Sequence, residues 1–147
     1  MTATNHAMTG AIIGLTVSNP VVAVVVAFFS HFVLDTIPHF GVDKDFYKTK
    51  PFKVLLAIDA LLCVVLVAIL FSYHHTNWFV PALAAFAAAS PDLWSFKRFY
   101  YAKKDKFYKP GYIARFASKI QWFEHPTGAL VELAWATSAI IILAHIL

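Results

Sequence analysis

The run FKVLLAIDALLCVVLVAILFSY, Phe52–Tyr73, decides the fold class of this chain. A helix needs about 20 apolar residues to cross the ~30 Å hydrocarbon core of a bilayer, and only Lys53 and Asp59 interrupt this run. Trp78–Phe96 and Pro126–Leu147 are two further apolar runs of similar length. The sequence therefore predicts an integral membrane protein built from hydrophobic helices.

The composition of the whole chain agrees with this prediction. Of the 147 residues, 60% are hydrophobic and 14% are charged, whereas soluble domains average about 45–50% apolar and about 25% charged residues. A chain of this length is expected to form one domain. The single cysteine, Cys63, lies inside an apolar run, so no disulfide framework is expected. The first ten residues carry no Lys or Arg, which argues against a cleaved signal peptide.

The N-terminal third is predicted to form a helical hairpin. Thr4–Val17 is apolar but short for a membrane span, Asn19-Pro20 marks a turn, and proline suits the first position of the next helix. The sequence leaves open whether this hairpin crosses the membrane twice or dips in and returns. The expected fold is thus all-α, a polytopic helical membrane bundle of about five hydrophobic helices in a single integral membrane domain, residues 1–147. The expected helices are 4–17, 20–38, 52–73, 78–97 and 126–147.

The basic residues predict the orientation of the bundle. All twelve Lys and Arg lie between Lys44 and Lys119, in two groups that flank the apolar runs. Because such residues concentrate on the cytoplasmic side of membrane proteins, segments 39–52 and 97–124 are expected to be cytoplasmic. The N-terminus is then inside and the C-terminus outside. Basic clusters also occur in nucleic-acid-binding proteins, but these ones border membrane helices, so no nucleic-acid partner is expected.

The second basic segment contains a helix of a different kind. In Tyr112–Phe123, the residues Ile113, Phe116, Ile120 and Phe123 recur at helical spacing among polar and basic neighbours. This pattern predicts an amphipathic interfacial helix on the inner leaflet, with its cations near anionic lipid headgroups. The alternative is a solvated cytoplasmic loop.

Ionisable residues enter the apolar runs near one end of the predicted bundle. Such residues are costly inside a membrane and usually face the bundle interior or a wet cavity. In the orientation given above, each lies at the cytoplasmic end of its helix, so we expect one shared pocket. The residues concerned are His6, His31, Asp35, His39, Asp59, Asp92, Glu124 and Glu132.

SHFVLDTIPH, residues 30–39, is the sharpest motif among them. His31 and Asp35 are four residues apart and therefore project from one face of a helix. Pro38 ends or kinks that helix, which lets His39 turn back toward the same space. Nitrogen and oxygen ligands of this kind suit a divalent metal, Zn²⁺ first, with Mn²⁺ or Mg²⁺ as alternatives. We predict the metal ligands to be His6, His31, Asp35, Asp92 and His39.

Each of these residues also has a structural interpretation. His31 and Asp35 pair with each other in a bundle contact, Asp92 follows a proline and caps a helix end, and Asp59 is a hydrogen-bond partner between helices. In the same interpretation Glu132 pairs with a lysine, His39 is an interfacial loop residue and His6 is a solvated residue near the terminus. Gly10 and Gly14 form a GxxxG motif, which favours close helix–helix approach and would bring His6 toward the second helix.

These motifs resemble those of the bacterial membrane-bound metal-dependent hydrolase family. The family's His-Arg-Gly-x-x-His segment is absent here, and the Pro-Asp element follows the Ser-His element. HFVLDTIPH, residues 31–39, is also similar to the HFxxDxHQPxH run of zinc-dependent phospholipases C and single-strand nucleases, without the Gln. The matching residues are His6 with Gly10, Ser30-His31 to Asp35 with Pro38, and Pro91-Asp92.

The resemblance implies hydrolysis at one or two metal ions in the bacterial cytoplasmic (inner) membrane. The metal would lower the pKa of a bound water toward ~7, with Asp59, Glu124 and Glu132 as candidate catalytic residues that act as general base or orient the site. A lipid or lipid-linked substrate is expected, its anionic headgroup near the Lys and Arg segments. The alternatives are a non-catalytic metal-binding or haem-binding protein and a structural membrane protein. The oligomeric state, including a homo-oligomer, stays open.

Overall fold

The computed structural model describes residues 1–41, 46–73, 76–93, 111–120 and 123–147. Within these ranges the chain is helical, and the only β-type pairing is an isolated parallel bridge between His39 and Glu124. The helices are α1 (Ala3–Thr16), α2 (Pro20–Leu34), the 3₁₀ turn η1 (Phe46–Lys48), α3 (Lys50–Tyr73), α4 (Phe79–Ala89), α6 (Tyr112–Ile120) and α7 (Gly128–Ile146). The all-helical class predicted from the sequence is confirmed.

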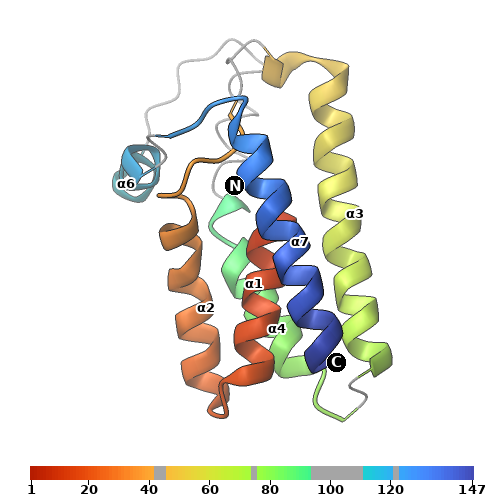
Figure 1. Ribbon diagram of the computed structural model, residues 1–147. Helices are drawn as coiled ribbons and strands as arrows, with labels where there is room; N and C mark the ends of the chain where they lie inside the picture. The colour runs from red at the N-terminus through yellow and green to blue at the C-terminus, as the bar shows by residue number, and fades with distance from the viewer. Residues whose placement is uncertain (42–45, 74–75, 94–110, 121–122) are drawn as a thin grey trace.

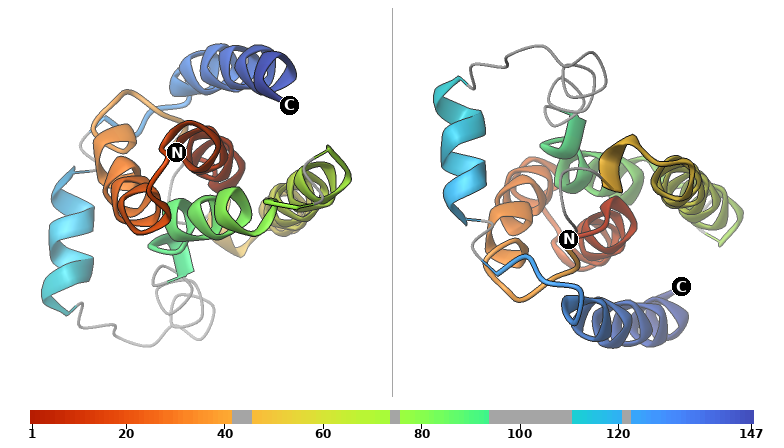
Figure 2. Two further views of the ribbon diagram at one scale, coloured as in Figure 1. Left: turned by 90° about the horizontal axis from the view of Figure 1, so that it is seen from below. Right: turned by 90° about the horizontal axis from the view of Figure 1, so that it is seen from above.

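The helices α1, α2, α3, α4 and α7 run up and down in alternation (Figure 1). Seen along the bundle axis, α1 lies among the other four helices (Figure 2). Helix α6 lies beside α2 and runs roughly perpendicular to the bundle axis (Figure 2). Segment 39–41, the start of α3 and the start of α7 therefore meet at one end of the bundle, and the turn at 17–19 lies at the other.

Residues that flank α2 on each side set its two ends. The Asn19 side chain accepts hydrogen bonds from the backbone N–H groups of Val21 and Val22 at 3.0 and 3.1 Å, and proline at the first position has no N–H to lose. The helix ends at Leu34, before the predicted residue 38, because Pro38 disfavours helical geometry for the residue that precedes it. Residues 35–37 form a turn instead.

The two glycines of the GxxxG motif let α1 approach α4. A methyl group on Gly10 would lie 2.4 Å from the carbonyl oxygen of Ala84, and one on Gly14 would lie 2.5 Å from Cα of Pro81. The close approach that the motif predicts is thus made against α4, whereas α2 was the expected neighbour. The small residues of α4 make this contact possible, because six positions of the helix are buried without large side chains.

Helices α3 and α7 are long and apolar enough to cross a membrane. Only 11% of the most apolar stretch of α3 and 17% of that of α7 is buried. The two shorter apolar helices, α2 and α4, also expose large side chains, such as Phe29 at 60% and Phe86 at 62%. Apolar patches of this extent on a folded chain mark a surface that meets a membrane or a partner.

The predicted interfacial helix 112–123 is present as α6 over Tyr112–Ile120, residues 121–122 lie outside the described residues, and Phe123 lies in a turn. Helix α6 exposes Tyr112 and Phe116, and the ring of Phe116 lies 6.0 Å from that of Phe32 at the end of α2. The predicted helix 78–97 ends earlier in the structure, at Ala89, because Pro91 has no N–H to continue it, and Ser90 and Pro91 form a turn. Its residues 94–97 lie outside the described residues.

Candidate metal centre

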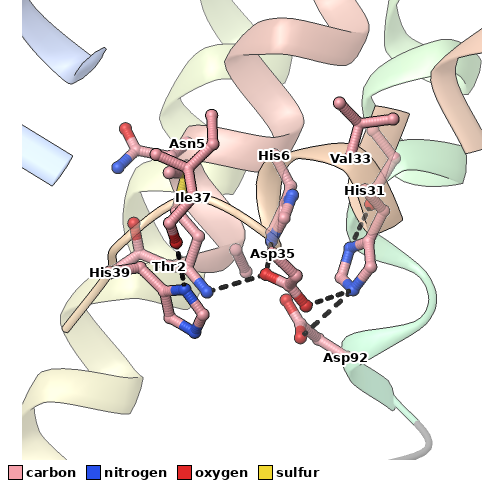
Figure 3. A network of polar contacts seen from close by, with 12 residues as sticks. Thr2, Asn5, His6, His31, Val33, Asp35, Ile37, His39 and Asp92 are labelled. Atoms are coloured by element: carbon pink, nitrogen blue, oxygen red, sulfur yellow. Dashed lines mark hydrogen bonds and ion pairs between the residues drawn. The ribbon is translucent and has the colours of Figure 1, made fainter. Parts of the chain in front are cut away.

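Two histidines and one aspartate from α1 and the end of α2 form a buried cluster (Figure 3). Nε2 of His6 lies 3.2 Å from Oδ1 of Asp35, and Nε2 of His31 lies 3.3 Å from Oδ2 of the same carboxylate. One ligand atom from each of the three residues lies within 4.8 Å of the others. Two ligand atoms bound about 2.0–2.2 Å from one tetrahedral ion lie about 3.3–3.6 Å apart. The cluster could therefore hold a single small cation once its more distant ligand atoms move closer together.

Helical geometry and packing bring the three side chains together. His31 and Asp35 are one helical turn apart at the end of α2. His6 comes from the neighbouring helix α1 and stacks on His31, with ring centroids 3.9 Å apart and an interplanar angle of 26°. All three residues are at most 3% exposed. A pair of stacked imidazoles facing one carboxylate is thus fixed by two helices that pack directly on each other.

The end of α4 orients His31. Pro91 has no N–H for the carbonyl of Ala87, and the Ser90 hydroxyl donates to that carbonyl instead, at 2.8 Å. The next carbonyl, that of Ala88, is one of the free acceptors at the end of the helix. It accepts a hydrogen bond from Nδ1 of His31 at 2.8 Å. This bond requires a proton on Nδ1, so Nε2 is the nitrogen of His31 that is left to face Asp35, as in metal-binding histidines.

His6 carries an unused hydrogen-bonding nitrogen. Its Nδ1 is buried and has no hydrogen-bond partner among the described residues. A buried polar atom without a partner costs about 1–3 kcal/mol. Nδ1 points away from Asp35, which Nε2 faces, so a water beside Nδ1 would remove this cost whereas an ion bound at Nε2 would not. The chemistry of the donor set, two imidazoles and a carboxylate, fits Zn²⁺ and related divalent ions.

Asp92 forms the accessible edge of the cluster. Its Oδ1 lies 3.9 Å from Nε2 of His31, and 30% of its side chain is exposed, against 3% for the side chains of His31 and Asp35. On another side, the amino group of Met1 lies 2.9 Å from Oδ1 of Asp35. The Asp92 side is thus the direction from which a water or a substrate could reach the cluster.

His39 pairs with Glu124 beside this cluster. Nδ1 of His39 donates to the carbonyl of Ile37 at 2.8 Å, and Nε2 lies 3.8 Å from Oε1 of Glu124, with no hydrogen-bond partner among the described residues. Burial of the ring disfavours its charged form, but the Glu124 carboxylate and the Ile37 carbonyl outweigh this effect and raise the pKa of His39 above 6.5. The backbone bridge between His39 and Glu124 holds the two residues side by side.

Asp59 binds the start of α1. Its carboxylate accepts hydrogen bonds from the backbone N–H groups of Ala3 and Thr4, both at 2.9 Å, and from the Thr4 hydroxyl. These N–H groups have no partner inside the helix, so Asp59 acts as a helix cap contributed by α3. Through this cap it positions His6, which lies two residues further along α1.

Glu132 also binds backbone N–H groups. Its Oε2 accepts from the N–H of Thr2 at 3.0 Å and from the Asn5 side chain at 3.3 Å, while its Oε1 accepts from the N–H of Phe40 at 3.0 Å. One buried carboxylate on α7 thereby joins the start of α1 to the segment after α2. Its contacts are those of a residue that orients the site.

The predicted site residues thus divide into three groups. His6, His31 and Asp35 come together, and Asp92 lies at their edge. His39 pairs with Glu124, and Asp59 and Glu132 hold backbone N–H groups. Sequence reasoning missed the Ala88 carbonyl, although Ser90-Pro91 marks the end of α4, where the last carbonyls lack intrahelical partners.

No protein-family model, curated protein or solved structure matches this chain. Assignment of a function therefore depends on the geometry of the cluster and on the chemistry that its donor atoms allow.

Proposed function

We propose that this protein is a membrane-embedded metal-dependent hydrolase that acts on a lipid or lipid-linked phosphoester or ester at the cytoplasmic leaflet. The observation that carries the proposal is the buried His6–His31–Asp35 cluster, with an oriented Nε2 on His31 and a partly exposed carboxylate, Asp92, at its edge. Buried ionisable residues in an apolar bundle are costly, and such clusters usually have a functional role.

Three protein ligands are the pattern of catalytic rather than structural zinc sites, because a fourth position stays open. When bound there, a divalent metal supplies a water of lowered pKa and polarises a phosphoryl or acyl oxygen. His6, His31 and Asp35 would hold the ion, and Asp92 would bind the ion or the incoming water from the accessible side.

Acid–base chemistry is assigned to the pair of Glu124 and His39. The Glu124 side chain is 32% exposed and so can meet a substrate, while Nε2 of His39 has no other hydrogen-bond partner among the described residues. Asp59 and Glu132 act as orienting residues in this proposal, because their oxygens already hold the backbone at the start of α1.

The proposal places the bundle in the bacterial cytoplasmic membrane with five crossing helices and α6 on the inner leaflet. The apolar exposed faces of α3 and α7 support it, as do the alternating directions of the five helices (Figure 1). Lys50 and Lys53 at the start of α3 lie at the end of the bundle that carries the cluster, where they suit an anionic headgroup.

Reporter fusions test this orientation. The first reporter is a phosphatase that is active only outside the cytoplasm. It is expected to be active when fused after Leu147. It should be inactive when fused in segment 42–45, because basic segments stay inside. A fluorescent protein that folds only in the cytoplasm should give the reverse pattern at both points. Equal phosphatase activity at the two fusion points would contradict the proposed topology.

Hydrolysis itself is tested with purified protein in detergent. A phospholipid presented in mixed micelles should be cleaved. Removal of the metal with a chelator should lower the rate of cleavage at least about a hundredfold, because the metal supplies the activated water. Addition of Zn²⁺ or Mn²⁺ should restore the rate. Products are measured by mass spectrometry, which also distinguishes phosphoester from ester cleavage.

The control for this assay is His145→Ala, which changes an exposed histidine whose Nδ1 donates to the carbonyl of Ile141 in its own helix. It should retain full activity, whereas His31→Ala should not. Cleavage that survives chelation, or an equal rate in His31→Ala, would refute the hydrolase assignment. A Soret absorption band in the purified protein would instead identify a haem site.

A further inference from the structure

An apolar groove runs between α3 and α4 over the flank of α1. Its cavity volume is about 600 Å³, and its lining includes Ala7, Cys63, Ala68, Trp78, Ala85 and Ala89. The alanines of α4 and Ala68 of α3 leave space between the larger side chains of the walls. The volume lies within the range of about 300–1,000 Å³ typical of small-molecule sites, and the walls offer almost no polar partner.

The groove begins beside the metal centre. Ala7 follows the cluster residue His6 in α1, and Ala89 follows Ala88, whose carbonyl orients His31. From Ala89 the groove follows α4 back to Trp78, a distance of about 16 Å by helical rise. It is therefore long, apolar and directed along the bundle axis, with the polar cluster at one end only.

We infer that this groove binds an acyl chain of the lipid substrate, with the hydrolysed group at the metal centre. The inference rests on the proposed function for the position of the headgroup. An acyl chain fits the observations because one wall is α3, a helix able to cross a membrane whose apolar stretch is only 11% buried. A chain lying along this helix has the direction of lipid chains in a bilayer, and Lys53 near the start of α3 suits an anionic headgroup.

Photocrosslinking tests the groove directly. The probe is a phosphatidylglycerol with a diazirine on one acyl chain, added at one molecule per protein in detergent micelles. Crosslinked residues are mapped by mass spectrometry. We expect labelling to concentrate on the groove walls of α3 and α4, and we expect Ala68→Phe to reduce it about tenfold by filling the groove. Ala68 is exposed, so this substitution leaves the buried core unchanged.

The matched control is Ala60→Phe, which adds the same ring to an exposed position of α3 outside the groove lining. It should label like the wild type. Even labelling over the exposed faces of α3 and α7, or unchanged labelling in Ala68→Phe, would overturn the inference. So would a wild-type dimer that Ala68→Phe dissociates, because a second copy of the chain would then cover the groove.

The same experiment separates the two proposals. Crosslinking needs neither bound metal nor turnover, so it is done on chelated protein, which should bind the probe in the groove without cleaving it. Groove labelling without metal-dependent hydrolysis would refute the hydrolase and leave the lipid site in place. Hydrolysis with no preference for the groove would refute the lipid site and leave the metal chemistry in place.

Discussion

Replacing His31 with alanine is expected to empty the metal centre. The wild-type protein should purify with about one divalent ion per chain, and His31→Ala with less than about a tenth of that amount. Loss of a residue that only orients a metal ligand typically lowers metal affinity about 10- to 100-fold, and loss of one of three ligands should lower it further. The substitution also leaves the buried Asp35 carboxylate without its partner at 3.3 Å. Elemental analysis by mass spectrometry of the two proteins, purified in parallel, measures the difference.

Two further variants make this result specific. Asp35→Asn keeps the size of the side chain but removes its charge, and it should lose the metal as His31→Ala does. His145→Ala should keep it, because the His145 ring is exposed and, among the described residues, bonds to Ile141 of its own helix. Circular dichroism checks that each variant is helical. Equal metal content in His31→Ala and the wild type would mean that the cluster is a structural ion-pair network.

The fold was largely predictable because it depends on local patterns. Runs of apolar residues gave the five helices of the bundle to within a few residues at most ends, and Asn19-Pro20 gave the turn between the first two. The end of α2 was placed too late, since Pro38 acts on the residues that precede it as well as on its own position. Crossing of a membrane by all five helices stays a proposal.

The candidate site was predictable only in part. His31 and Asp35 share a helix, so their spacing alone places them together, and the break at Ser90-Pro91 marks the helix end that faces them. The roles of Asp59 and Glu132 depend on contacts that are distant in sequence. In the sequence, a carboxylate that binds a metal looks the same as one that accepts a hydrogen bond from the N–H of Thr4. Only the fold decides which group faces the carboxylate.

Gly10→Ala is expected to destabilise the bundle by about 2 kcal/mol. Alanine would gain about 0.5–1 kcal/mol over glycine inside a helix, but its methyl group would lie 2.4 Å from the carbonyl oxygen of Ala84 and 2.8 Å from Cα of Ala85. Overpacking costs about 1–3 kcal/mol when side chains can adjust, and here the neighbour is helix backbone, which cannot rotate away. Thermal unfolding in detergent, followed by circular dichroism, measures the loss.

The same substitution should weaken metal binding, because α1 carries His6 whereas α4 holds His31 through the Ala88 carbonyl. Pushing α1 away from α4 separates the two imidazoles, which now stack at 3.9 Å. The matched control is Gly111→Ala, since a methyl group at Gly111 meets no atom within 4 Å. That variant should change stability by less than about 0.5 kcal/mol and retain its metal. If Gly10→Ala behaved like Gly111→Ala in both measurements, α1 and α4 would not be in contact at this position, and the cluster could not be assembled as described.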